Sequence, residues 1–94
     1  MDLAQARTEF LAYVAVERGL SVNTLDAYTR DLEGYLLWLN GKKITLPNQV
    51  TRSDVEEYIG SLRDLGMAPA SVERHTAALR NFHKFMAVEQ ICES

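Results

Sequence analysis

The sequence predicts an all-α fold, a compact bundle of four helices in one domain. Apolar residues recur at intervals of three and four, the period of an amphipathic helix, and no stretch alternates long enough to predict a strand. Gly and Pro are scarce, at 5 and 2 of 94 residues, and most of them stand where a helix is expected to begin or end. A chain of this length has room for a single modest core.

The first half of the chain predicts two helices. Residues 2–18 form the first, because apolar side chains share one face and Gly19 is a natural stop. Its apolar positions are Leu3, Phe10, Tyr13 and Val14. Ser21 or Asn23 can cap the second helix, which runs up to Asn40-Gly41. The stripe of this helix consists of Leu25, Tyr28, Leu32, Tyr35, Leu36 and Leu39.

The second half predicts a loop and two further helices. Residues 42–50 break the helical period and contain a proline, so they form a loop anchored by Ile44, Leu46 and Val50. Thr51, followed three residues later by an acid, is close to a capping box and starts a helix that ends at Gly66. The apolar positions of this helix are Val55, Ile59, Leu62 and Leu65. Pro69 suits the first turn of a fourth helix, which runs to about Gln90.

Composition and charge exclude several classes of protein. A net charge of -3 argues mildly against a domain that binds nucleic acid through bulk charge. The lone Cys92 forms no internal disulfide, which favours a cytoplasmic protein. No apolar run approaches the roughly 20 residues of a membrane span. We see no nucleophile beside a base, no phosphate loop and no metal-ligand cluster, so we expect no catalytic residue, metal, cofactor or small-molecule substrate.

The fourth helix carries two contrasting faces. Its predicted core face consists of Val72, Thr76, Leu79, Phe82 and Met86, with His83 beside it. A second stripe, predicted to face outward, consists of Ser71, Arg74, Ala78 and Asn81, flanked by His75. This stripe is either an ordinary solvated face or a surface presented to DNA, where Arg, Asn and His reach base edges and Ser suits a phosphate. For Arg80, a bridge to an acid such as Asp31 competes with a DNA contact.

Four ordered segments carry a family resemblance. In FLAYVAVERGLSVNTLDAYTRDLEGYLLWL (10–39), an apolar helix leads into a turn and then a second patterned helix. The turn contains Glu17, Gly19, Leu20 and Ser21, and the second helix carries Asn23, Thr24, Leu25, Ala27, Tyr28, Arg30, Asp31 and Leu32. VTRSDVEEYIGSL (50–62) and SVERHTAALRNFHKFM (71–86) supply the other two segments. Together they resemble the N-terminal core-binding domain, a SAM-like domain, of tyrosine recombinases of the Xer and phage-integrase type, with departures at Thr76 and His83.

The resemblance implies a function for the chain and for a longer parent. Residues 1–94 are expected to be a single core-binding domain, a fragment of a longer recombinase whose C-terminal catalytic domain is absent. The fragment is then no enzyme by itself. The parent acts through a 3′-phosphotyrosyl intermediate, and this domain forms half of a clamp on duplex DNA during DNA integration or recombination. The expected partners are duplex DNA and other recombinase protomers, with no membrane.

The resemblance also implies which residues touch DNA, because in the family the second and fourth helices face the major groove. The expected contacts are Asn23, Thr24, Tyr28, Ser71, Arg74 and His75, with Arg80 and Lys84 as flanking candidates. Arg74 is the leading residue, since its planar fork can hold a guanine edge or a phosphate in two hydrogen bonds. The alternative function is a helical protein–protein interaction domain without DNA binding, which the acidic net charge favours slightly.

Overall fold

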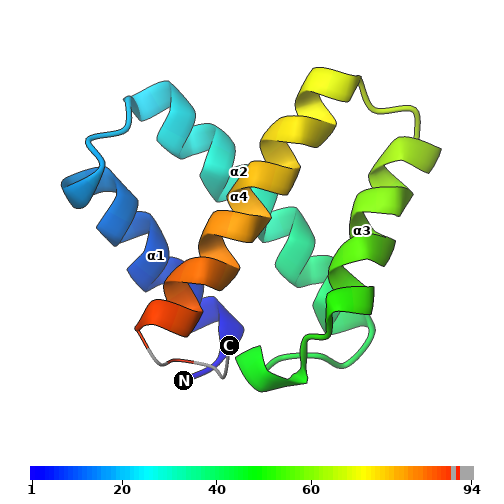
Figure 1. Cartoon of the computed structure of the whole chain (residues 1–94), viewed down its shortest axis with the longest axis horizontal. Coiled ribbons are helices and arrows are strands. Elements are labelled where there is room, and N and C mark those ends of the chain that lie inside the picture. The colour runs from blue at the N-terminus through cyan, green and yellow to red at the C-terminus, as the bar shows by residue number, and fades with distance from the viewer. Residues whose placement is uncertain (90, 92–94) are drawn as a thin grey trace.

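Four helices pack around one core in the computed structural model of the chain, which describes residues 1–89 and 91 (Figure 1). They are α1 (Leu3–Glu17), α2 (Val22–Gly41), α3 (Arg52–Asp64) and α4 (Pro69–Val88). The loop between α2 and α3 holds one turn of 3₁₀ helix, η1 (Pro47–Gln49). The described residues contain no strand, which confirms the predicted all-α bundle.

Side-chain caps start three of the helices. Asp2 caps α1, where its carboxylate accepts a hydrogen bond of 2.8 Å from the backbone N–H of Gln5. Ser21, rather than Asn23, caps α2. Thr51 starts α3 in the predicted capping box. Each cap satisfies a backbone N–H that the first turn of a helix would otherwise leave unpaired.

Glycine and proline define the remaining helix ends. Gly19 and Gly66 follow α1 and α3 with φ of +57° and +81°, the left-handed conformation that glycine adopts without steric cost. Pro69 opens α4, as predicted, because a proline lacks only an N–H that the first turn does not use. The helix ends at Val88, slightly before the predicted end near Gln90, which itself lies outside the described residues.

Two aromatic groups fill the core. One joins α1 to α4, where the ring centroids of Phe10 and Phe82 lie 5.5 Å apart and both side chains are fully buried. The other joins α2 to α3, where Tyr35 lies 5.1 Å from Tyr58 between ring centroids. Tilted rings at these separations add favourable contact beyond the apolar area that they bury.

Three predicted core positions are wrong. Leu65 is 82% exposed and Tyr13 is 40% exposed, while Leu46 in the loop is also largely exposed. Leu65 follows the last residue of α3 and stands just before the left-handed turn at Gly66. Tyr13 covers the edge of the core instead, with its ring centroid 5.1 Å from that of Phe85.

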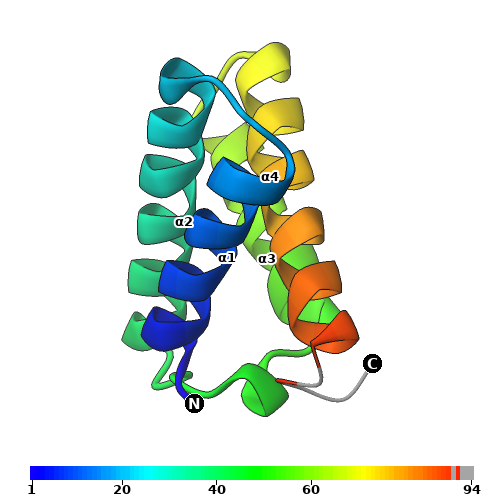
Figure 2. The same ribbon diagram turned by 90° about the vertical axis from the view of Figure 1, so that its left-hand side faces the viewer.

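The order of the helices in space decides which surfaces remain free. α2 and α4 pack against each other and begin at the same end of the molecule, at the top of Figures 1 and 2. α1 and α3 flank this pair on opposite sides in Figure 1. The start of α3 and the loop that holds η1 lie at the other end. The first turns of α2 and α4 therefore lie at the same end of the molecule, spread apart beyond the point where the two helices cross (Figure 1).

Candidate nucleic-acid interface

A buried carboxylate joins α2 to α4 beneath the proposed DNA-binding residues. Asp31 accepts two hydrogen bonds from one guanidinium, 2.9 Å from Arg74 Nε to Oδ2 and 3.0 Å from Arg74 Nη2 to Oδ1. His75 Nε2 lies 3.2 Å from Oδ1 of the same carboxylate. The Asp31 side chain is only 4% exposed, whereas that of Arg74 is 44% exposed. We call these three residues the Asp31 cluster.

The geometry of the Asp31 cluster leaves part of Arg74 free. A guanidinium has five N–H donors in a rigid fork, and the carboxylate takes the Nε and Nη2 side of it. Three donors at the outer end of the fork remain for another acceptor. The hydrogen bonds to Asp31 raise the pKa of Arg74 above its ordinary value, so the group is always charged.

His75 is more buried than is expected of a residue that contacts DNA. Its side chain is 12% exposed, and its Nδ1 is buried without a hydrogen-bond partner in the structure. The ring therefore lies chiefly against Asp31, and little of its surface is open to a partner.

The predicted outward stripe of α4 is partly wrong. Ala78 is fully buried, and Ser71 and Asn81 are half-buried. The outward stripe instead consists of Glu73, Ala77, Arg80 and Lys84, all exposed. The physical reason is the crossing of α2, which occupies the side of α4 from which Arg74 reaches Asp31. The small side chain of Ala78 suits this close helix crossing rather than an outside partner.

Arg80 and Lys84 lie on the outer side of α4. Arg80 lines one hollow with Arg63 and another with Arg52, both on α3, so it lies on the α3 side of the helix and away from α2. The bridge from Arg80 to Asp31 considered from the sequence is wrong, because Arg74 and His75 take that carboxylate. Lys84 is exposed one turn further along.

The three candidates on α2 differ in exposure. Asn23 is exposed in the first turn of the helix. Thr24 is half-buried, and its N–H and hydroxyl both bond to the hydroxyl of the Ser21 cap, at 3.2 Å and 3.0 Å. Tyr28 is half-buried and packs against the core. Asn23 is thus the most accessible of the three.

The position of Asp31 in the sequence indicates that this carboxylate has a partner. Asp31 stands within the apolar stripe of α2, between Tyr28 and Tyr35. A carboxylate at a buried position needs a cation or several donors, since burying it unpaired is costly. The pattern predicts a partner on a neighbouring helix, but several cations on α4 satisfy it equally well.

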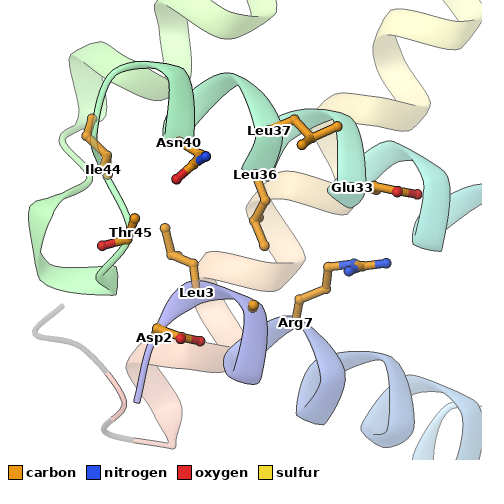
Figure 3. A pocket seen from close by; sticks show the side chains of 10 residues that line it. Asp2, Leu3, Arg7, Glu33, Leu36, Leu37, Asn40, Ile44 and Thr45 are labelled. Carbon is orange, nitrogen blue, oxygen red and sulfur yellow. The ribbon is translucent and has the colours of Figure 1, made fainter.

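A separate groove lies between the first turns of α1 and the last turns of α2 (Figure 3). Its volume is about 420 Å³. Leu3 of α1 points toward Leu36 of α2 across it, with Arg7 and Glu33 at one end (Figure 3). The groove lies away from the first turns of α2 and α4. It is therefore distinct from the proposed DNA-binding residues.

The described part of the chain offers neither a metal site nor a membrane-spanning helix. Among residues 1–89 and 91, no group of His, Cys, Asp or Glu could hold a metal ion. No helix of the described chain is long and apolar enough to cross a membrane.

Comparison with known proteins identifies the family. Residues 8–90 match the model of the phage integrase N-terminal SAM-like domain. The chain is 37% identical over 90 residues to tyrosine recombinase XerD of Oceanobacillus iheyensis, covering 95% of this chain and 30% of that protein. It is 40% identical over 79 residues to tyrosine recombinase XerD of Listeria monocytogenes, covering 83% of this chain and 27% of that protein.

The extent of these matches defines what they show. The chain spans about three tenths of the length of these relatives, and no solved structure matches it. The matched residues include most of α1 and all of α2, α3 and α4. The chain belongs to the phage integrase N-terminal SAM-like domain family.

Proposed function

We propose that this chain is the DNA-binding N-terminal domain of a site-specific tyrosine recombinase and forms half of a clamp around duplex DNA. The family match and the tyrosine recombinases among the relatives support this function. The catalytic tyrosine of such an enzyme would lie outside residues 1–94, so the chain itself would bind without cutting. Other recombinase protomers on the same DNA would be its protein partners.

The observation that carries the proposal is the common end at which α2 and α4 begin (Figures 1 and 2). The start of a helix presents unpaired N–H groups and a partial positive charge, which favour a phosphate. Asn23 and Ser71 stand in these first turns, with Arg74 one turn along α4. Two helix starts and a charged fork on one end of the molecule suit the backbone and groove edges of a duplex.

Two further cations lie on the outer side of α4, on another face of the helix from Arg74. Arg80 and Lys84 are exposed and stand four residues apart, so they follow one line down the helix. Such cations suit successive phosphates and add affinity without sequence information. Binding would be weak overall, because the net charge of -3 opposes it and few phosphates are neutralised.

Titration of the chain with a fluorescently labelled duplex at several salt concentrations tests the proposal. We expect weak binding at low salt that declines steadily as salt rises, because bound phosphates release counterions. An affinity that does not change with salt concentration, or no binding at low salt, would contradict DNA binding by this chain.

Two matched asparagines on α2 test the surface itself. Asn23→Ala removes an exposed amide at the start of α2 and should weaken DNA binding about 2- to 10-fold, the worth of one hydrogen bond. Asn40→Ala removes the same exposed group at the far end of the helix, beside the groove, and should leave the affinity unchanged. Equal effects of the two variants would refute the proposed orientation.

The groove between α1 and α2 favours a second candidate, a helical protein–protein interaction domain. It is lined partly by leucines, including the exposed Leu37, and such surfaces suit another protein better than a phosphate backbone. A partner protein that binds at Leu37, together with no binding to duplex DNA, would establish this function in place of the first.

A further inference from the structure

We propose that Asp31 is a positioning residue for DNA recognition, which holds the Arg74 fork in the orientation that its DNA contact requires. The inference rests on the proposed function. Asp31 itself is buried and touches no DNA in this arrangement; it acts through Arg74. The observations that carry it are the two hydrogen bonds, the burial of the carboxylate and the exposure of the outer end of the guanidinium.

The contacts of the carboxylate fix more than the distance between two helices. An unpaired arginine on a helix surface samples many rotamers, and ordering it on DNA costs conformational entropy. Bonds to both Nε and Nη2 define the plane of the Arg74 guanidinium as well as its position. Ordering the side chain before DNA arrives reduces the entropy lost on binding.

Helix packing alone gives no comparable reason for this carboxylate. A buried ion pair often stabilises a fold no better than well-packed apolar residues of the same volume. α2 and α4 already share the packed side chains of the core around this crossing. The Asp31 cluster in addition orients the guanidinium of Arg74. Three N–H donors remain at the exposed end of this group.

Because Asp31 is an acid, electrostatics and positioning predict opposite changes in DNA affinity when its charge is removed. Removing a negative charge near DNA should strengthen binding if only electrostatics matters. Asp31→Asn keeps the size of the side chain but replaces one acceptor oxygen with an NH₂ group, which then faces an N–H of Arg74. Positioning therefore predicts about 5- to 10-fold weaker DNA binding from a substitution that removes an acid.

Asp26 provides the matched control. It lies on the same helix about one turn earlier, carries the same charge and is exposed. Asp26→Asn should leave binding unchanged or strengthen it about twofold, since it removes repulsion at an exposed position. The two substitutions alter the net charge equally, so opposite effects separate positioning from bulk charge.

Arg74→Lys supplies the second arm. It keeps the positive charge but lacks the planar fork, so alone it should weaken DNA binding about as much as Asp31→Asn. In the Arg74→Lys background, Asp31→Asn should cause no further loss. Should Asp31→Asn fail to fold by circular dichroism and thermal unfolding, Arg74→Lys alone decides: wild-type affinity in a folded Arg74→Lys protein overturns the proposal.

A spectroscopic signature completes the experiment. In nitrogen-15 NMR spectra of the wild-type chain, the Nε–H of Arg74 should be protected from exchange both free and with a mixed-sequence duplex, and Asp31→Asn should abolish this protection. Three results overturn the proposal: an Asp31→Asn protein that binds DNA as tightly as the wild type, a weakening that persists beside Arg74→Lys, or loss of Nε–H protection on DNA. Failure of the wild-type chain to bind any duplex refutes the proposed function instead, even if the free protein keeps the protected Nε–H.

Discussion

His83 and Tyr35 form a polar contact at the edge of the core. His83 Nε2 and the Tyr35 hydroxyl lie 2.8 Å apart and link α4 to α2. Burial lowers the pKa of His83 to about 4, and burial also raises the pKa of Tyr35 well above its ordinary value. Both side chains are thus neutral near pH 7, and the hydrogen bond satisfies the buried hydroxyl of Tyr35.

The lowered pKa of His83 predicts a loss of stability in acid. In the unfolded chain His83 becomes protonated below pH 6.5. In the folded chain it becomes protonated only below about pH 4. The contribution of His83 to stability is therefore greatest above pH 6.5, and its protonation should lower the free energy of unfolding by about 3 kcal/mol between pH 7 and pH 4. Urea unfolding across this range measures the change.

His83→Gln isolates the contribution of this one residue. The glutamine amide can still bond to Tyr35 but does not titrate, while every carboxylate of the chain titrates as before. The variant should lose about 3 kcal/mol less than the wild type on acidification. Parallel stability curves for the two proteins would show that His83 is not the group responsible.

At the scale of elements, helix starts were predicted better than helix faces. The cap at Thr51, the stop at Gly66 and the opening of α4 at Pro69 follow from local chemistry, because each depends on residues adjacent in sequence. The inward face of α4 depends on where α2 crosses it, which no local pattern specifies. The local pattern therefore predicts an outward position for Ala78, which is fully buried in the structure.

The capping box at the start of α3 allows a prediction about the stability of this helix. The Thr51 hydroxyl accepts from the Asp54 N–H at 3.1 Å and donates to its carboxylate at 2.9 Å. The Asp54 carboxylate also accepts from the Thr51 backbone N–H, and these bonds lower its pKa. Thr51→Ala should reduce the free energy of unfolding by about 1 kcal/mol, the usual worth of such a cap.

Ser53→Ala is the control for this prediction. This substitution also removes a hydroxyl, at an exposed position of the same turn. It should change the free energy of unfolding by less than about 0.5 kcal/mol. Denaturant unfolding of both variants measures the difference. A Thr51→Ala protein as stable as the Ser53→Ala protein would show that the box does not stabilise α3.

For the whole molecule, the family was recognisable from the sequence and the arrangement of charge was not. The four-helix order and the family resemblance are confirmed, since both follow from patterns along the chain. The pairing of Asp31 with Arg74 and His75 needed the packed structure, because it joins residues 43 and more positions apart. DNA binding through Arg74 and the other candidate residues stays a prediction.

Part of the negative charge of the domain lies away from the starts of α2 and α4. The acids Asp54, Glu56 and Glu57 lie in the first turns of α3, at the opposite end from the starts of α2 and α4 (Figure 1). Lys42 pairs with two of them, at 3.3 Å to Asp54 and 2.9 Å to Glu57, so this cation is already engaged. The starts of α2 and α4 keep two exposed acids of their own, Asp26 and Glu73, so a duplex bound there would meet both signs of charge.

The most direct test of DNA binding at this end is an NMR titration of the labelled chain with duplex DNA at low salt, which follows each backbone amide. We predict that shifts concentrate in residues 21–28 of α2 and 70–84 of α4 and fade as salt rises, while residues 36–45 beside the groove stay unchanged. Shifts confined to the groove, or no shift at any amide, would contradict the account.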